Sequence, residues 1–525
     1  MSLLDRFARD GRIRSAVFSY LILAYAFVQP VGFRHTYPRA ADRQAFGASF
    51  GINTGLRLLY GRPHDIATVP GYVEWRVGGV LAIVFAAFGL MSAVGVLRGE
   101  EESGRTELLL SLPRSRRVVL ASALAAVGLG IVLLATLEWI AVVAGGVPIG
   151  GAFLMALAEA SVAAVLAGVG AVTSQLATTR RGANGLAAIV LAVFFLARAL
   201  ADTVDGLGAL RWITPLGWAE LVRPFTAPRP AVLLLPMSAT IGLVALSVRW
   251  LRRRDIGTGL LPGRDAAPMR RVGLGALTGQ GLRSQWGVLV AWILGVGTFL
   301  FLLGVVSRSI SPADVPHNVR DEIAKLGTGS IVTPAGYLAF VYLFVTVAVA
   351  AFGCAQVGTA RGEEAAGRLE MSLALPVARA RWLSGRLVIA AAAAGVLSLI
   401  AGVAGWAGAR TAGVQLGLLT MVRAGLNCLP CALLFLGLAA LGYAVLPGIA
   451  ERLGYGVLAL AFLWQVVGSL LGPPRWVLQL SPFAHVATVP VEPVDVAGAA
   501  GLSLIGMLAA AVAVWCFSRR DLQLD

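Results

Sequence analysis

The chain has 525 residues, of which 58% are hydrophobic and only 13% are charged, and its mean hydropathy is +0.81. Soluble domains average about 45–50% apolar and about 25% charged residues, so this composition excludes a chain of soluble domains and indicates an integral membrane protein with many spans. The net charge of +16 is carried almost wholly by arginine, and arginines that flank membrane spans explain it more simply than nucleic-acid binding does.

Twelve segments are apolar enough to cross a bilayer, which takes about 20 residues in a helix. The six in the first half are Ser15–Phe33, Val77–Leu97, Val118–Ala144, Gly150–Leu176, Ala183–Leu200 and Ala231–Arg249. The six in the second half are Trp286–Val306, Pro334–Ala360, Leu383–Ala409, Ala424–Leu446, Leu453–Leu471 and Ala497–Phe517.

An Arg-, Gly- and Pro-rich stretch divides the chain in the middle. We predict a first six-span half at 1–250, a cytoplasmic linker at 251–285 and a second six-span half at 286–525. Most arginines fall in segments on the same side as the N-terminus, so the positive-inside rule places both termini in the cytoplasm. The N-terminal "LLDRFARDGRIR" alternates apolar and basic residues and predicts an interfacial helix. The arginine-rich, lysine-poor composition favours a bacterial plasma membrane.

The two halves share a charged segment. "RGEEESGRTELLLSLPRSR" (Arg98–Arg116, the first charged element) aligns without a gap to "RGEEAAGRLEMSLALPVAR" (Arg361–Arg379, the second charged element), and 11 of the 19 positions are identical. Pro-containing "TPLGW" and "SPFAH" likewise precede the last span of each half. Because each half has an even number of spans, we expect an all-α polytopic membrane protein built from two parallel six-helix repeats.

Each charged element follows the second span of its half and so faces the cytoplasm. Glu101 and Arg105 are four residues apart, as are Glu364 and Arg368, so each pair is predicted to lie on one face of a short amphipathic helix that Pro113 or Pro376 ends. A single copy would suggest a solvated hairpin. Two matched copies in halves that have otherwise diverged favour a surface for a partner.

The doubled pattern resembles the E-E-x-x-G-R-x-E-x-x-x-x-x-P-x-x-R signature of type-two ABC transporter permeases, and the whole chain is similar to fused twelve-span permeases of the polyketide-antibiotic (tetronasin) exporter type. The resemblance implies that each element is a coupling helix and docks on one of two copies of a cytoplasmic ABC ATP-binding subunit. The residues it assigns to these contacts are Glu100, Glu101, Gly104, Arg105 and Glu107 in the first half and Glu363, Glu364, Gly367, Arg368 and Glu370 in the second.

The chain has no P-loop of its own. Such a loop needs Gly-Lys-Ser/Thr, and the only lysine, Lys325, lies in "AKLG". The expectation is therefore a permease that is not an enzyme, has no catalytic residues and binds no cofactor, with ATP and Mg on the partner subunit. The resemblance implies export of hydrophobic or amphipathic drug-like or lipid-like compounds.

Ionisable residues inside spans are costly and often functional. Glu138, Glu159 and Arg198 lie in the third, fourth and fifth predicted spans and are candidates for the substrate pathway. The alternative is that Glu138 and Arg198 form a structural pair or lie near the membrane interfaces. The same two glutamates are also the only candidates for the relay that an ion-coupled secondary transporter would need, which is the competing function; a membrane scaffold is a third. Neither "CLPC" (Cys428–Cys431) nor the four scattered histidines predicts a metal site, since no second ligand pair exists.

Overall fold

The computed structural model describes residues 3–51, 57, 60–111, 113, 115–204, 206–261, 277–308, 333–365, 367, 369–370, 378–448, 450–471 and 479–521. All regular structure in these ranges is helical, which confirms the expected all-α class. The chain forms two compact units, Met1–Met269 and Arg270–Asp525, and the division falls within the stretch predicted as the linker.

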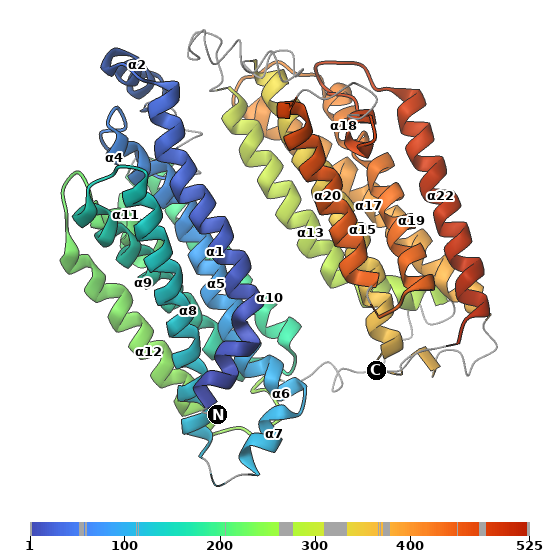
Figure 1. The fold of residues 1–525 in the computed structure, drawn as a ribbon, viewed down its shortest axis with the longest axis horizontal. Helices are drawn as coiled ribbons and strands as arrows, with labels where there is room; N and C mark the ends of the chain where they lie inside the picture. The colour runs from blue at the N-terminus through green and yellow to red at the C-terminus, as the bar shows by residue number, and fades with distance from the viewer. Residues whose placement is uncertain are drawn as a thin grey trace. The chain divides into compact units, whose positions relative to one another are not determined.

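The first unit is a helical bundle (Figure 1). Its helices are α1 (Leu3–Thr36), α2 (Ala40–Gly51), α4 (Val69–Tyr72), α5 (Gly79–Val94), α6 (Glu100–Glu102), α7 (Arg105–Leu110), α8 (Arg116–Ala144), α9 (Ile149–Leu176), α10 (Arg180–Thr203), α11 (Pro215–Val222) and α12 (Leu234–Leu251). The π-helical turns η1 (Val73–Gly78) and η2 (Gly95–Gly99) join α4, α5 and α6 into one helix, and the short 3₁₀ helices η3 (Gly208–Ile213) and η4 (Pro230–Leu233) flank α11.

Small residues bring the central helices of this unit together. Helix α5 packs along α9, and a Cβ atom added to Gly89 would lie 2.1 Å from the carbonyl oxygen of Ala163. Close backbone approach at glycine is the usual way in which transmembrane helices gain packing contacts, because lipid offers no hydrophobic driving force between them. Leu166, Ala86 and neighbouring apolar side chains complete the buried core around this crossing.

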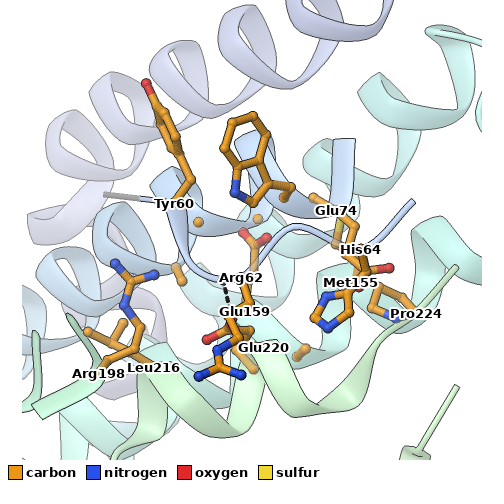
Figure 2. A pocket seen from close by; sticks show the side chains of 16 residues that line it. Tyr60, Arg62, His64, Glu74, Met155, Glu159, Arg198, Leu216, Glu220 and Pro224 are labelled. Atoms are coloured by element: carbon orange, nitrogen blue, oxygen red, sulfur yellow. Dashed lines mark hydrogen bonds and ion pairs between the residues drawn. The ribbon is translucent and has the colours of Figure 1, made fainter. Parts of the chain in front are cut away.

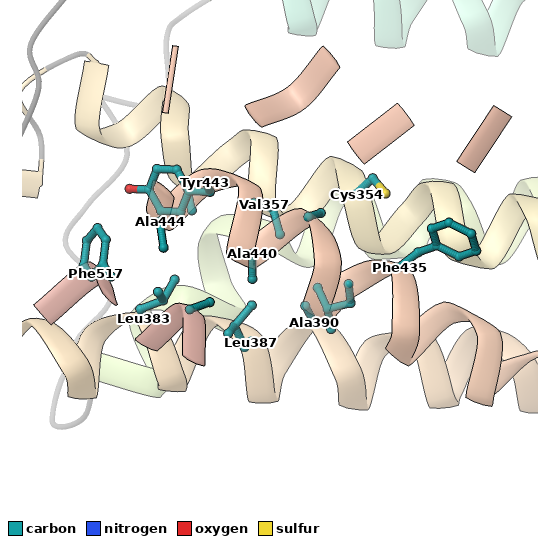
Figure 3. Close-up of a cluster of buried hydrophobic side chains, with 14 of the residues drawn as sticks. Cys354, Val357, Leu383, Leu387, Ala390, Phe435, Ala440, Tyr443, Ala444 and Phe517 are labelled. Carbon is teal, nitrogen blue, oxygen red and sulfur yellow. The ribbon is translucent and has the colours of Figure 1, made fainter. Parts of the chain in front are cut away.

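The second unit repeats this plan. Its helices are α13 (Leu277–Ser307), α15 (Pro334–Ala365), α17 (Arg379–Thr411), α18 (Leu418–Leu426), α19 (Leu429–Val445), α20 (Ala450–Leu471) and α22 (Val496–Arg519), with the 3₁₀ helix η7 (Pro482–His485) before α22. Figure 3 shows its core, where Val357, Leu383, Phe435, Ala440 and Phe517 come from four helices and meet in one apolar cluster.

Eleven helices among the described residues are long and apolar enough to span a membrane, and they coincide with eleven of the twelve predicted spans. The remaining predicted span, Leu453–Leu471, lies on α20, in which the segment Leu453–Phe462 is apolar. The predicted span Ala424–Leu446 is in fact broken into α18 and α19, with Pro430 in the first turn of α19. Proline is tolerated there because the amide hydrogens of a first turn have no helical partner.

The N-terminal segment differs from its prediction. It does not form a separate interfacial helix but continues directly into the first span as the 34-residue α1. The reason is packing: Leu3 and Phe7 are buried against Leu109 of α7 and Val119 of α8. The start of the chain thus packs against the inward side of α7 in the first charged element.

The two Pro-containing motifs form matching local structures. The Thr214 hydroxyl accepts a hydrogen bond from the Gly217 amide at 2.9 Å, and the Ser481 hydroxyl accepts one from the Phe483 amide at 3.3 Å. In both, the capping residue is followed by proline at the start of a short helix.

Candidate functional site

The first charged element is a helix, a turn and a second helix rather than one amphipathic helix. The second span runs on to Glu102, the chain turns at Gly104 with φ +72°, and α7 begins at Arg105. Gly367 has the same left-handed conformation, with φ +69°. This backbone region is open to glycine at little cost, so the repeated glycine is explained by helix termination.

The turn changes the ion pairing that the sequence predicts. Arg105 Nη1 donates to Glu100 Oε1 at 3.0 Å, so the predicted pair of Arg105 with Glu101 does not form. The i,i+4 rule fails here because it assumes an unbroken helix, and Gly104 breaks it. The corresponding Arg368 lies outside the described residues, so the second predicted pair is not described.

Glu101 instead binds the end of the sixth span. Its carboxylate, 6% exposed, accepts hydrogen bonds from Nη1 and Nη2 of Arg254 at 2.5 and 2.6 Å and from the amide of Gly257 at 2.6 Å. Arg98 Nη1 lies 3.0 Å from the same carboxylate. Two-pronged arginine–carboxylate bonds of this kind are strong and geometrically specific.

Glu364 makes the same contact in the second unit. Its carboxylate, 1% exposed, accepts from Nη1 and Nη2 of Arg520 at 2.9 and 2.7 Å, and the Tyr443 hydroxyl donates to it at 2.6 Å. We name these two arrangements the Glu–Arg clasps: Glu101 with Arg254, and Glu364 with Arg520.

The last arginine of each charged element completes its clasp. Arg116 Nη1 donates to the carbonyl oxygen of Arg254 at 3.2 Å, and Arg379 Nη1 donates to that of Arg520 at 2.6 Å. Both clasp arginines belong to an Arg-Arg-Asp sequence that follows the last span of its half, at 253–255 and 519–521. That recurrence was the one signal in the sequence that could have revealed the contact.

The other acids of the elements have individual roles. Glu100 pairs with Arg6 at 2.9 Å as well as with Arg105, and Glu363 pairs with Arg386. Glu102, which the second element does not share, accepts from the amide of Arg180 at 2.7 Å and so caps the start of α10. The extra acid of the first element is thereby explained.

Among the described residues of the two elements, both charged and apolar side chains face outward. Glu107 and Glu370 are exposed, the Arg105 side chain is 52% exposed, and Leu108 is 71% exposed. Leu109 and Leu369 point inward and are buried. Of the predicted contact residues, then, the acids at 107 and 370 are open to a partner, whereas Glu101 and Glu364 are occupied within the chain.

The predicted pathway residues lie at the other end of the first unit. Glu159 and Arg198 line a cavity of about 40 Å³ together with Arg62, His64 and Glu220 (Figure 2). Glu138 lies beside Glu159 and does not line the cavity. The Glu138 carboxyl oxygens have no hydrogen-bond partner among the described residues, so the alternative pair of Glu138 with Arg198 finds no support.

Burial governs the polar groups around this cavity. It raises the pKa of Glu220 to about 7, with the nearby Asp202 carboxylate adding to the effect. It lowers the pKa of His64 to about 4, with Arg223 and Arg211 adding to the effect. Among the described residues no cluster of His, Cys, Asp or Glu could hold a metal ion, and Cys428 and Cys431 are buried free thiols.

Comparison with known proteins finds two matching family models and one curated relative. The family described as ABC-2 family transporter protein matches residues 9–209, and the family described as Multidrug efflux system permease Rv1217c, C-terminal domain, matches residues 274–518. The multidrug efflux system permease protein Rv1217c of Mycobacterium tuberculosis (strain ATCC 25618 / H37Rv) is 30% identical over 499 residues, which cover 93% of this chain and 89% of that protein.

The chain belongs to the ABC-2 family of transporter permeases. Membership implies an ABC ATP-binding partner for this permease. Family membership also accounts for the multi-pass helical architecture. It favours an ABC transporter permease over an ion-coupled secondary transporter and over a membrane scaffold.

Proposed function

We propose that this permease moves hydrophobic or amphipathic drug-like compounds out of a bacterial cell, across the plasma membrane, with both termini in the cytoplasm. Support comes from the relative, whose name describes a multidrug efflux permease, and from arginines that concentrate beside the charged elements. Energy would come from ATP hydrolysed on a separate subunit, since the permease sequence has no P-loop.

The observation that carries this proposal is the matched pair of charged elements. Each unit presents one element at the end of its second span, and each element is fastened by a Glu–Arg clasp to the end of the last span of the same unit. Two such elements fit two copies of the ATP-binding subunit, one per element. A movement of either element would be passed on to two spans at once.

The clasps divide the predicted contact residues into two groups. The exposed acids Glu107 and Glu370 are proposed to contact the partner directly. Glu101 and Glu364, whose side chains are 6% and 1% exposed, are proposed to hold the element in position, with Gly104 and Gly367 setting the turn. Glu138, Glu159 and Arg198 remain our proposal for polar groups along the substrate pathway. The cavity that Glu159 and Arg198 line has a volume of about 40 Å³, so a drug-like compound could pass only if this part of the unit opens.

Co-purification with the ATP-binding subunit tests the docking surface. Reversing both exposed acids, with Glu107→Arg and Glu370→Arg, is expected to weaken binding at least tenfold, about 1.4 kcal/mol, because complementary charges would become like charges. The matched control is Asp10→Arg, an exposed acid on α1 that lies outside both elements. Full retention of the subunit by the double variant would contradict the assigned surface.

Reconstitution in vesicles tests the function itself. Vesicles that contain the permease and its ATP-binding subunit should take up an amphipathic dye only when ATP is supplied on the side of the charged elements. A subunit that cannot hydrolyse ATP should abolish accumulation. Transport that instead follows an imposed ion gradient without ATP would support the ion-coupled carrier.

A further inference from the structure

Glu138 and Glu159 form a buried acid pair in the first unit. Glu138 lies on α8 and Glu159 on α9, and their side chains are 0% and 2% exposed. No donor from the described residues reaches any of their four carboxyl oxygens. The two carboxyl groups lie close enough to hydrogen-bond with each other once one of them carries a proton.

Electrostatics restricts the charge of such a pair. An isolated buried carboxylate costs several kcal/mol, and two adjacent carboxylates cannot both be ionised. If they share one proton, the protonated group donates a hydrogen bond to its neighbour and a single negative charge is spread over both. This arrangement also supplies the donor that the surrounding side chains do not.

The cavity in Figure 2 lies against Glu159 and has room for water. Its volume of about 40 Å³ is enough for roughly three water molecules at 10–15 Å³ each. Arg62 and His64 also line a second, more open pocket of about 480 Å³. These two residues therefore lie between the small cavity and the open one, at the end of the unit away from the charged elements.

The other charged groups around the cavity already have contacts. Glu74 of η1 accepts from the amide of Phe225 at 3.1 Å and lies 3.9 Å from His64 Nδ1. Glu220 of α11 accepts from the amide of Arg62 at 2.6 Å. The guanidinium carbon of Arg198 on α10 lies 5.3 Å from the centre of the Phe195 ring. The positive charge of Arg198 also partly opposes the rise that burial causes in the pKa of Glu220.

We propose that Glu138 and Glu159 are a proton-binding site, in which one shared proton exchanges through the water of this cavity with the side opposite the charged elements. Water in the cavity delivers the proton to a carboxylate oxygen of Glu159, and the resulting O–H donates to Glu138. The second half does not repeat this pair, because the position aligned with Glu138 is Ala401. The site needs neither ATP nor a transported compound, so its test is independent of the proposed function.

Infrared difference spectra between H₂O and D₂O, recorded on the full permease in lipid nanodiscs, test this site. Burial raises the pKa of Glu74 and of Glu220 to about 7, so the spectra are recorded at about pH 9, where both are ionised. The wild type should then show a carboxylic-acid carbonyl band that shifts on transfer to D₂O. The double variant E138Q/E159Q, which keeps both side-chain shapes, should lose this band. The control E107Q changes an exposed acid at the other end of the unit and should keep it.

Three outcomes would contradict the proton-binding site. Absence of the band in the wild type, or its persistence in the double variant, overturns the shared proton. A band that does not shift in D₂O overturns exchange through the cavity. If the double variant does not fold, E138Q and E159Q are measured singly: each should move or remove the band, because an amide replaces a carboxyl neighbour, and an unchanged band in both would refute the pair.

Discussion

Replacing Glu101 with Ala should lower the free energy of unfolding of the permease by about 3–5 kcal/mol. The change leaves Arg98 and Arg254, which are 1% and 7% exposed, buried without the carboxylate that neutralises them. Such uncompensated charges cost more than the original ion pair contributed. Thermal unfolding in detergent, followed by size-exclusion chromatography, measures the effect.

The matched control is Glu107→Ala, which removes an exposed acid six residues away and should change stability by less than about 0.5 kcal/mol. Glu364→Ala should behave like Glu101→Ala, because Glu364 holds Arg520 in the same way. Replacing Glu101 and Arg254 together, with Ala and Met, should cost less than the sum of the two single changes. Strict additivity would show that the clasp contributes no coupling.

Gly89→Val should be the second large effect. The Cβ atom of any larger residue at this position would lie 2.1 Å from the carbonyl oxygen of Ala163, a distance that forces α5 away from α9. Overpacking typically costs about 1–3 kcal/mol, and we expect the upper end because the obstacle is backbone that cannot rotate aside. Loss of folded permease on size-exclusion chromatography measures it.

Gly128→Val on α8 is the control for this change. A Cβ atom there meets nothing within 4 Å, so the variant should remain close to the wild type in stability. Equal behaviour of the two variants would mean that a general effect of valine in a helix, rather than the close contact of α5 with α9, determines the result.

Local patterns in the sequence were sufficient to predict most membrane spans and the two charged elements of this protein. Hydropathy identified spans that coincide with eleven helices of the structure, and the recurrence of Arg98–Arg116 at Arg361–Arg379 identified two matched elements. Both signals are local, because a bilayer requires each span to satisfy its own backbone hydrogen bonds within about 20 residues. The family resemblance rested on the same local pattern and agrees with the relative found.

Local sequence patterns could not predict which residues the charged elements contact in the folded chain. The sequence favoured Glu101 with Arg105 by spacing, whereas the folded chain binds Glu101 to Arg254, 153 residues away. Spacing rules hold only within one unbroken helix, and the left-handed turn at Gly104 ends that helix before Arg105. Glu138 and Glu159, 21 residues apart in the chain, likewise become neighbours only through the packing of α8 against α9.

Composition and hydropathy therefore predicted a membrane protein with many spans and two matched charged elements, since a span depends on residues adjacent in the chain. Folding established which acids are available to a partner and which are held internally. The reason is that the burial and pairing of charged side chains depend on contacts between helices that are distant in the sequence. An unpaired buried carboxylate is costly, so a fold that gives it a partner is more stable.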